Sequence, residues 1–104
     1  MEKKSKAETY VGFAIKARKV KTGYNACETL KKSHLIIVCK TASENTKKAS
    51  VSLANKLKCG VLITKNETLE SITYKDGIKV IAINDYNLAK AITEQAKDEF
   101  TPIL

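Results

Sequence analysis

Three short apolar runs constrain the fold of this chain more than any other feature. They read "LIIVC" at 35–39, "GVLIT" at 60–64 and "IKVIAI" at 78–83. Runs of this length, rich in Ile and Val, are typical of strands that are covered on both faces of a sheet. We therefore expect a buried sheet to form the centre of the fold.

Segments with helical spacing alternate with these runs. The first, 5–18, has apolar side chains every three or four residues, and a second follows the "KVKTG" stretch. Ser43 is a predicted N-cap for a third helix, which Gly60 is expected to end. A short fourth helix is expected from Asn66, and a fifth helix from Asp85.

This alternation predicts an α/β fold with a central, largely parallel sheet and helices on both faces. A chain of 104 residues has room for one core, so we expect residues 1–104 to form a single domain. We interpret Pro102 as the mark of a loose C-terminal tail.

Composition narrows the class of partner. The formal net charge is +8, which favours a partner with dense negative charge, either nucleic acid or an anionic membrane surface. The longest apolar run, "HLIIVC", is far shorter than the roughly 20 residues that a membrane span needs. The opening "MEKKSKAETY" lacks the apolar segment of a signal peptide. We expect a cytoplasmic protein without a membrane partner.

Cysteine usage agrees with that compartment. Cys27, Cys39 and Cys59 are odd in number and form no Cys-x-x-Cys pair, which is typical of reduced thiols. Two of them, Cys39 and Cys59, lie in apolar runs. We expect these two to be small core residues, because free cysteine is among the most buried residue types.

Residues suited to catalysis are few. The chain has one histidine, His34 at the edge of a predicted strand, no glycine-rich phosphate loop and no His/Cys cluster with metal-binding spacing. We therefore predict a non-enzymatic protein without a cofactor or metal. One enzymatic alternative stays open, because "LIIVCKTASENT" places Cys39 between a strand and a helix, as in phosphocysteine enzymes and sugar-transport phosphocarriers. Its loop has no glycine to curl around an anion and no arginine to clamp one, which favours a core cysteine.

Basic residues concentrate around one predicted turn. The stretch 16–32, "KARKVKTGYNACETLKK", contains one acid and these basic residues: Lys16, Arg18, Lys19, Lys21, Lys31 and Lys32. Folding back at Gly23 would gather several of them beside the start of a helix, a surface that suits phosphates. The alternative is that the lysines only solvate a helix face.

Three segments, in order along the chain, resemble the kink-turn-binding ribosomal protein superfamily: "VGFAIKARKVKTGYNACETL", "LIIVCKTASENTKK" and "LESITYKDGIKVIAI". This superfamily includes large-subunit ribosomal proteins of archaea and eukaryotes and a small bacterial YlxQ-like branch. The parts "GFAIKARKVKTG" and "ASENTKK" are most similar to that bacterial branch. The resemblance implies a three-layer α/β/α sandwich with a mixed sheet, in which "KVKTG" adds a short strand.

The resemblance also implies a ribosome-associated RNA-binding protein of translation, whose partner is structured RNA, either ribosomal RNA or a kink-turn RNA. We expect a monomer. In relatives, the turn and start of the second helix enter a kinked internal loop, and a loop before the last strand closes over a flipped-out nucleotide. Carried over by position, the first surface comprises Lys19, Lys21, Thr22, Gly23, Tyr24, Asn25, Lys31 and Lys32. The second surface comprises Thr73, Tyr74 and Lys75.

These residue types suit RNA, because glycine lets the backbone approach, asparagine offers a donor and an acceptor to base edges, and lysines neutralise phosphates. The chain also differs from the family pattern. It has Ala26 where many kink-turn binders have Glu, and Thr29 where they have Lys. Glu70 and Tyr74 stand where relatives often have glycine. A protein-interaction module of the same fold is a further alternative, as some members of the superfamily are.

Overall fold

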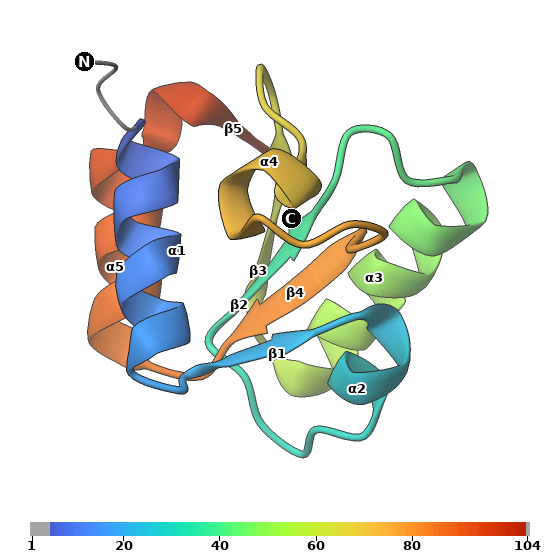
Figure 1. Cartoon of the computed structure of the whole chain (residues 1–104). Helices are drawn as coiled ribbons and strands as arrows, with labels where there is room; N and C mark the ends of the chain where they lie inside the picture. Colours follow the sequence, from blue (N-terminus) through green and yellow to red (C-terminus); the bar gives the residue numbers. More distant parts are fainter. Residues whose placement is uncertain (1–4, 104) are drawn as a thin grey trace.

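A five-stranded mixed sheet forms the centre of the computed structural model, which describes residues 5–103 (Figure 1). The strands are β1 (Val20–Thr22), β2 (Leu35–Val38), β3 (Gly60–Thr64), β4 (Val80–Ile83) and β5 (Phe100–Pro102). They lie side by side in the order β1-β4-β2-β3-β5. The three apolar runs are confirmed as strands, and the short strand implied at "KVKTG" is β1.

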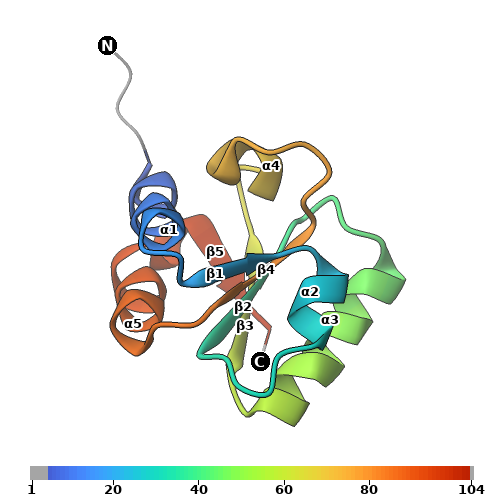
Figure 2. The ribbon, with the colours of Figure 1, turned by 60° about the horizontal axis from the view of Figure 1, so that its bottom comes forward.

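Helices cover both faces of this sheet. They are α1 (Lys6–Lys16), α2 (Tyr24–Glu28), α3 (Glu44–Leu57), α4 (Leu69–Thr73) and α5 (Tyr86–Gln95), followed by a 3₁₀ turn, η1 (Lys97–Glu99). Figure 2 shows α1 and α5 on one side of the sheet and α2 and α3 on the other. The chain is thus an α/β domain.

Strand β2 shows why its sequence is apolar throughout. Leu35 and Ile37 pack with residues of α1, α4 and α5. Ile36 and Val38 point the other way and pack with residues of α2 and α3. All four side chains are buried, because successive side chains of a strand point to opposite faces and both faces here are covered.

The expectation of a largely parallel sheet is wrong. Of the four strand pairings formed within residues 5–103, β2–β3 is parallel, whereas β1–β4, β2–β4 and β3–β5 are antiparallel. The reason lies in α4, whose five residues rise about 7.5 Å, less than half of the roughly 16 Å of β3. A helix this short does not return the chain to the edge where β3 began, so β4 runs back antiparallel.

The interpretation of Pro102 as part of a loose tail is also wrong. Phe100 to Pro102 form β5, an edge strand paired with β3, and Ile103 N donates to Val61 O at 3.0 Å. Phe100 anchors this strand, because its side chain is buried in the cluster with α1, α4 and α5. Proline is tolerated here because an edge strand needs fewer ladder hydrogen bonds.

Two of the helix starts follow the sequence signals. The side chain of Ser43, the predicted N-cap of α3, accepts from Thr46 N at 3.1 Å. The last helix begins at Asp85 as expected, and the Asp85 side chain caps it by accepting from Leu88 N at 2.9 Å. The start expected at Asn66 is wrong, because Thr68 caps α4 by accepting from Ser71 N at 3.1 Å and the helix begins at Leu69. The end of α3 differs from expectation. Lys58 caps it in the left-handed conformation (φ 57°), and Gly60 already belongs to β3.

Candidate nucleic-acid interface

The two segments expected to contact RNA emerge at the same edge of the sheet. We call it the carboxyl edge. It is the side of the sheet, across the strand ends, where β1, β2 and β3 end and β4 begins. Thr22 at the end of β1 pairs with Ile81 of β4. The next residue, Gly23, donates its N–H to Val80 O at 2.8 Å. The turn after β1 and the loop before β4 are therefore neighbours, although about 50 residues separate them in the sequence.

Gly23 lets the chain turn sharply between β1 and α2. Its φ is +87°, in the region that disfavours side chains, and a Cβ atom added there would meet nothing within 4 Å. Asn25 is exposed just beyond the turn, whereas Tyr24 is half-buried and packs on the core beneath α2 and α3. Cys27 is fully buried and fixes α2 from below. The turn thus offers open backbone and one free amide side chain on a fixed base.

The second expected segment divides between core and surface. Thr73 is buried, and its hydroxyl donates to Leu69 O at 2.8 Å, so its side chain faces away from solvent. Tyr74 is 71% exposed, as its place in the second expected surface requires, and Lys75 is exposed beside it. The Tyr74 hydroxyl donates to a carboxylate oxygen of Glu8 on α1.

Tyr74 also has an unusual backbone. It ends α4 in the left-handed conformation, with φ +58°, where glycine is the ordinary residue. A bulky exposed side chain is thus held in a conformation that disfavours it. Packing does not account for a tyrosine at this position, because most of the ring faces solvent.

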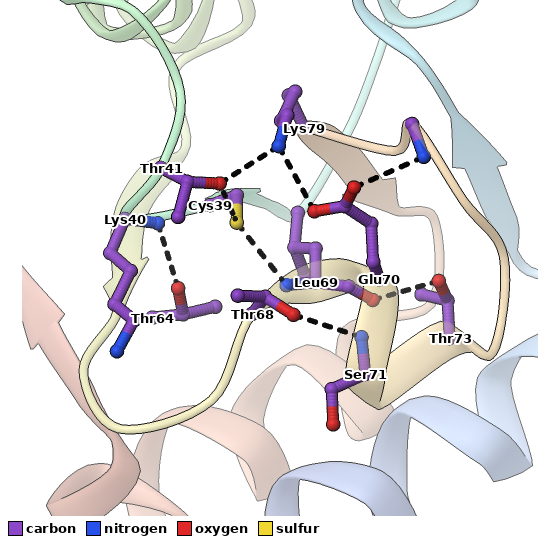
Figure 3. A network of polar contacts seen from close by, with 11 residues as sticks. Cys39, Lys40, Thr41, Thr64, Thr68, Leu69, Glu70, Ser71, Thr73 and Lys79 are labelled. Atoms are coloured by element: carbon purple, nitrogen blue, oxygen red, sulfur yellow. Dashed lines mark hydrogen bonds and ion pairs between the residues drawn. The ribbon is translucent and has the colours of Figure 1, made fainter.

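A polar brace, which the sequence reasoning missed, holds the loop before β4 (Figure 3). The Glu70 carboxylate accepts from Gly77 N at 3.1 Å and from Lys79 Nζ at 3.0 Å. Lys79 Nζ also donates to Thr41 Oγ1 at 2.8 Å, which ties the loop to the end of β2. The bond from Lys79 and the bond from Gly77 lower the pKa of Glu70. Opposite charges on either side of the "YKDG" turn are the signal that could have predicted this pair.

Cys39 lies beneath this brace, closed off from solvent. Its sulfur accepts from Leu69 N at 3.3 Å and lies 3.1 Å from Thr41 Oγ1 (Figure 3). Burial raises the pKa of the thiol, but the hydrogen bonds from Thr41 and Leu69, with the charge of Lys79, outweigh burial and lower it overall. The sulfur joins α4 to the end of β2, and the expectation that Cys39 is a core residue is confirmed.

Of the other two cysteines, only Cys59 differs from expectation in its burial. Cys59, expected in the core, is half-buried, whereas Cys27 is fully buried. Burial raises the pKa of Cys27 to about 11. Cys27 is therefore a neutral packing residue at ordinary pH.

The expected basic residues do not gather beside the start of α2. Lys21 is exposed in the middle of β1, while Lys19 precedes that strand, where its carbonyl accepts from Asn84 N at 2.7 Å. Lys31 and Lys32 directly precede Ser33, whose hydroxyl donates to Ile83 O at 3.2 Å. Ile83 ends β4, so Lys19, Lys31 and Lys32 lie toward the opposite edge of the sheet. The reason is that α2 carries the chain away from the carboxyl edge before β2 begins.

The histidine and the potential metal ligands within residues 5–103 were the remaining candidates for chemistry outside the carboxyl edge. His34 is half-buried, and its ring meets the ring of Tyr86 edge-on, with the ring centroids 5.9 Å apart. Across residues 5–103, no three His, Cys, Asp or Glu side chains come close enough to hold a metal ion. Over the same residues, no helix combines the length and apolar character needed to cross a membrane.

Comparison with known proteins adds no assignment. The chain matches no protein-family model, and no curated protein matches it. Its function is therefore inferred from its own residues and their arrangement.

Proposed function

We propose that this chain is a non-enzymatic, ribosome-associated RNA-binding protein that recognises structured RNA with a kink-turn or a related internal loop. One observation supports this most: the pairing of β1 with β4 brings the Gly23 turn and the Tyr74 loop to one edge of the sheet. These are the two segments that contact RNA in the superfamily that the sequence resembles. Each of the two segments exposes side chains at this edge: Asn25 in the first, and Tyr74 and Lys75 in the second.

The chemistry of this edge suits an unpaired stretch of RNA. The exposed ring of Tyr74 can stack on a base that is out of the helix. The exposed amide of Asn25 can donate to and accept from a base edge. Lys75 and Lys40, both exposed at this edge, can neutralise phosphates. The open backbone at Gly23 lets the RNA approach closely.

The three basic residues at the other edge have a role in this proposal as well. Lys19, Lys31 and Lys32 are exposed, so they extend the positive field along the molecule without sharing one contact surface with Tyr74. We assign them to backbone phosphates flanking the recognised loop, which raises affinity but not sequence preference.

The proposal includes the architecture and setting that the resemblance implies. These are a three-layer α/β/α sandwich, a monomer and a cytoplasmic location. It also takes the protein to act without a cofactor.

The phosphocysteine alternative is less well supported. A phosphocarrier needs its sulfur exposed to the donor, whereas the sulfur of Cys39 is buried and already accepts a backbone hydrogen bond from Leu69. Alkylation of the native protein separates the two functions: rapid modification of Cys39 near neutral pH favours the carrier, and resistance to modification favours a structural thiol.

A binding experiment with matched RNAs tests the proposal. We expect the protein to bind a kink-turn hairpin more tightly than a fully paired duplex of equal length at physiological salt. Tyr74→Ala should reduce that preference, whereas Tyr86→Ala, which removes another exposed tyrosine, on α5, should leave it unchanged. RNA binding that disappears at physiological salt would instead favour the protein-interaction alternative.

A further inference from the structure

A glycine in the middle of α1 has no structural explanation among residues 5–103. Gly12 lies at the seventh of the eleven residues of α1, where glycine is less favourable than alanine. A Cβ atom built at this position would meet nothing within 4 Å. Its φ is ordinary for a helix, since it is not among the residues with positive φ. Neither packing nor backbone geometry therefore requires a glycine here.

Gly12 lies in a shallow surface notch of about 220 Å³ on α1. The notch is lined by Glu8, Thr9, Gly12, Phe13 and Lys16. The Phe13 side chain is 54% exposed, so its ring presents an apolar surface to solvent beside the notch. Tyr10 meets the Phe13 ring edge-on, with centroids 6.4 Å apart, and so holds the ring in place.

The notch adjoins the proposed RNA interface. Glu8, at one end of the notch, accepts the hydrogen bond from the hydroxyl of Tyr74. Lys16 lines the other end, and Arg18 follows it as an exposed cation. The carboxylate of Glu8 is thus hydrogen-bonded to Tyr74, while Lys16 and Arg18 at the far end face solvent.

We propose that an unpaired nucleotide of the bound RNA enters this notch, with its base on the Phe13 ring and its phosphate near Lys16. This inference rests on the proposed function and extends it to α1, which the sequence did not place in the interface. A base is flat and of a size similar to the Phe13 ring, and a bare helix backbone beside that ring lets the base approach closely. Gly12 supplies that bare backbone.

Charge favours RNA over a protein helix as the occupant. A chain with a net charge of +8 repels a second copy of itself. The cations that follow the notch, Lys16 and Arg18, attract a phosphate backbone. A partner helix would instead need an apolar stripe on the exposed face of α1. Among the described residues of that helix, Phe13 alone is large, apolar and exposed.

Two substitutions test the notch. Phe13→Ala should weaken binding to a kink-turn hairpin with unpaired loop nucleotides by at least about fivefold, the effect of losing one stacked base. Gly12→Ala should raise the midpoint of thermal unfolding by about 4 °C, because alanine is the better helix former, and yet weaken RNA binding several-fold. Higher stability together with weaker RNA binding would indicate that Gly12 is required for the ligand and not for folding. Tyr86→Ala serves as the control for loss of an exposed aromatic ring.

Each outcome can be told apart from failure of the proposed function. If the wild-type protein does not bind the hairpin, the RNA function fails and the notch fails with it. If the wild-type protein binds and Tyr74→Ala weakens binding, but Phe13→Ala matches the Tyr86→Ala control, the notch alone is refuted. A change in sedimentation on substitution of Phe13, with RNA binding unchanged, would assign the notch to a protein contact and also refute it. Ultraviolet crosslinking that leaves a nucleotide on the α1 peptide would support it.

Discussion

Tyr74 allows the ring and the backbone of the proposed interface to be tested separately. The residue sits in the left-handed conformation and its ring is 71% exposed. Alanine removes the ring but retains the unfavourable backbone conformation, whereas glycine removes the ring and relieves it. Phenylalanine keeps the ring and removes only the hydroxyl that donates to Glu8.

The expected magnitudes follow from this geometry. A ring that buries so little surface contributes little to folding, so Tyr74→Ala should shift the midpoint of thermal unfolding by no more than about 3 °C. Tyr74→Gly should leave that midpoint unchanged or raise it. Loss of one stacked base should weaken binding to a kink-turn hairpin by roughly 5- to 150-fold in both variants. Tyr74→Phe should bind nearly as the wild type does.

Fluorescence anisotropy with a labelled hairpin, together with thermal unfolding of each variant, measures these quantities. The reasoning is refuted if Tyr74→Gly recovers wild-type affinity while Tyr74→Ala does not, since the backbone would then be the functional element. It is refuted equally if Tyr74→Ala unfolds far below the wild type, since the ring would then be a packing residue.

Three further predictions concern the same edge. Asn25→Ala should reduce discrimination between a kinked loop and a plain duplex by about 1 to 3 kcal/mol, and equal losses on both RNAs would contradict a base contact. Ala26→Glu combined with Thr29→Lys should tighten binding to a standard kink-turn. The glutamate alone should help less because it is repelled by phosphates. Titration of the double variant and of both single variants against one kink-turn checks this. Because the pKa of Glu70 lies below its ordinary value of 4.5 in the folded protein, its contribution is complete above about that pH and is lost as the pH falls through the lowered value. Amide exchange in the loop before β4, corrected for intrinsic rates, should therefore accelerate on acidification below about pH 4.5, and Glu70→Gln should remove that transition.

Much of the local structure could be predicted from the sequence because it depends on neighbouring residues. The apolar run that forms β2 and the caps at Ser43 and Asp85 are read from a few adjacent positions. The direction of β4 was not predictable in this way, because it depends on how far α4 extends before it ends. Strand β5 was missed for a related reason: its anchor, Phe100, gains its partners from helices distant in sequence.

The candidate site was predictable to a similar extent. Exposure of Tyr74 agreed with expectation, whereas Thr73, one residue earlier, turned out to be buried. A helix end cannot be located to a single residue from sequence, and one residue changes which side chain faces solvent. The brace of Glu70, Lys79 and Thr41 joins α4, the loop before β4 and the loop after β2. The opposite charges of Glu70 and Lys79 across the "YKDG" turn are a local signal for their ion pair, whereas the contact of Lys79 with Thr41 forms only once β4 pairs with β2 and has no local signal.

The position of β4 has a consequence for when the proposed RNA surface forms. In the sheet, β4 lies between β1 and β2, although both of those strands are synthesised before it. Strands β1 and β2 do not pair with each other, so a growing chain that lacks residues 80–83 has no strand that joins them. The turn after β1 and the loop before β4 therefore acquire their relative positions late in synthesis. A truncated or unfinished chain would carry most of the positive charge but not the assembled surface, so selective binding would distinguish complete molecules from fragments.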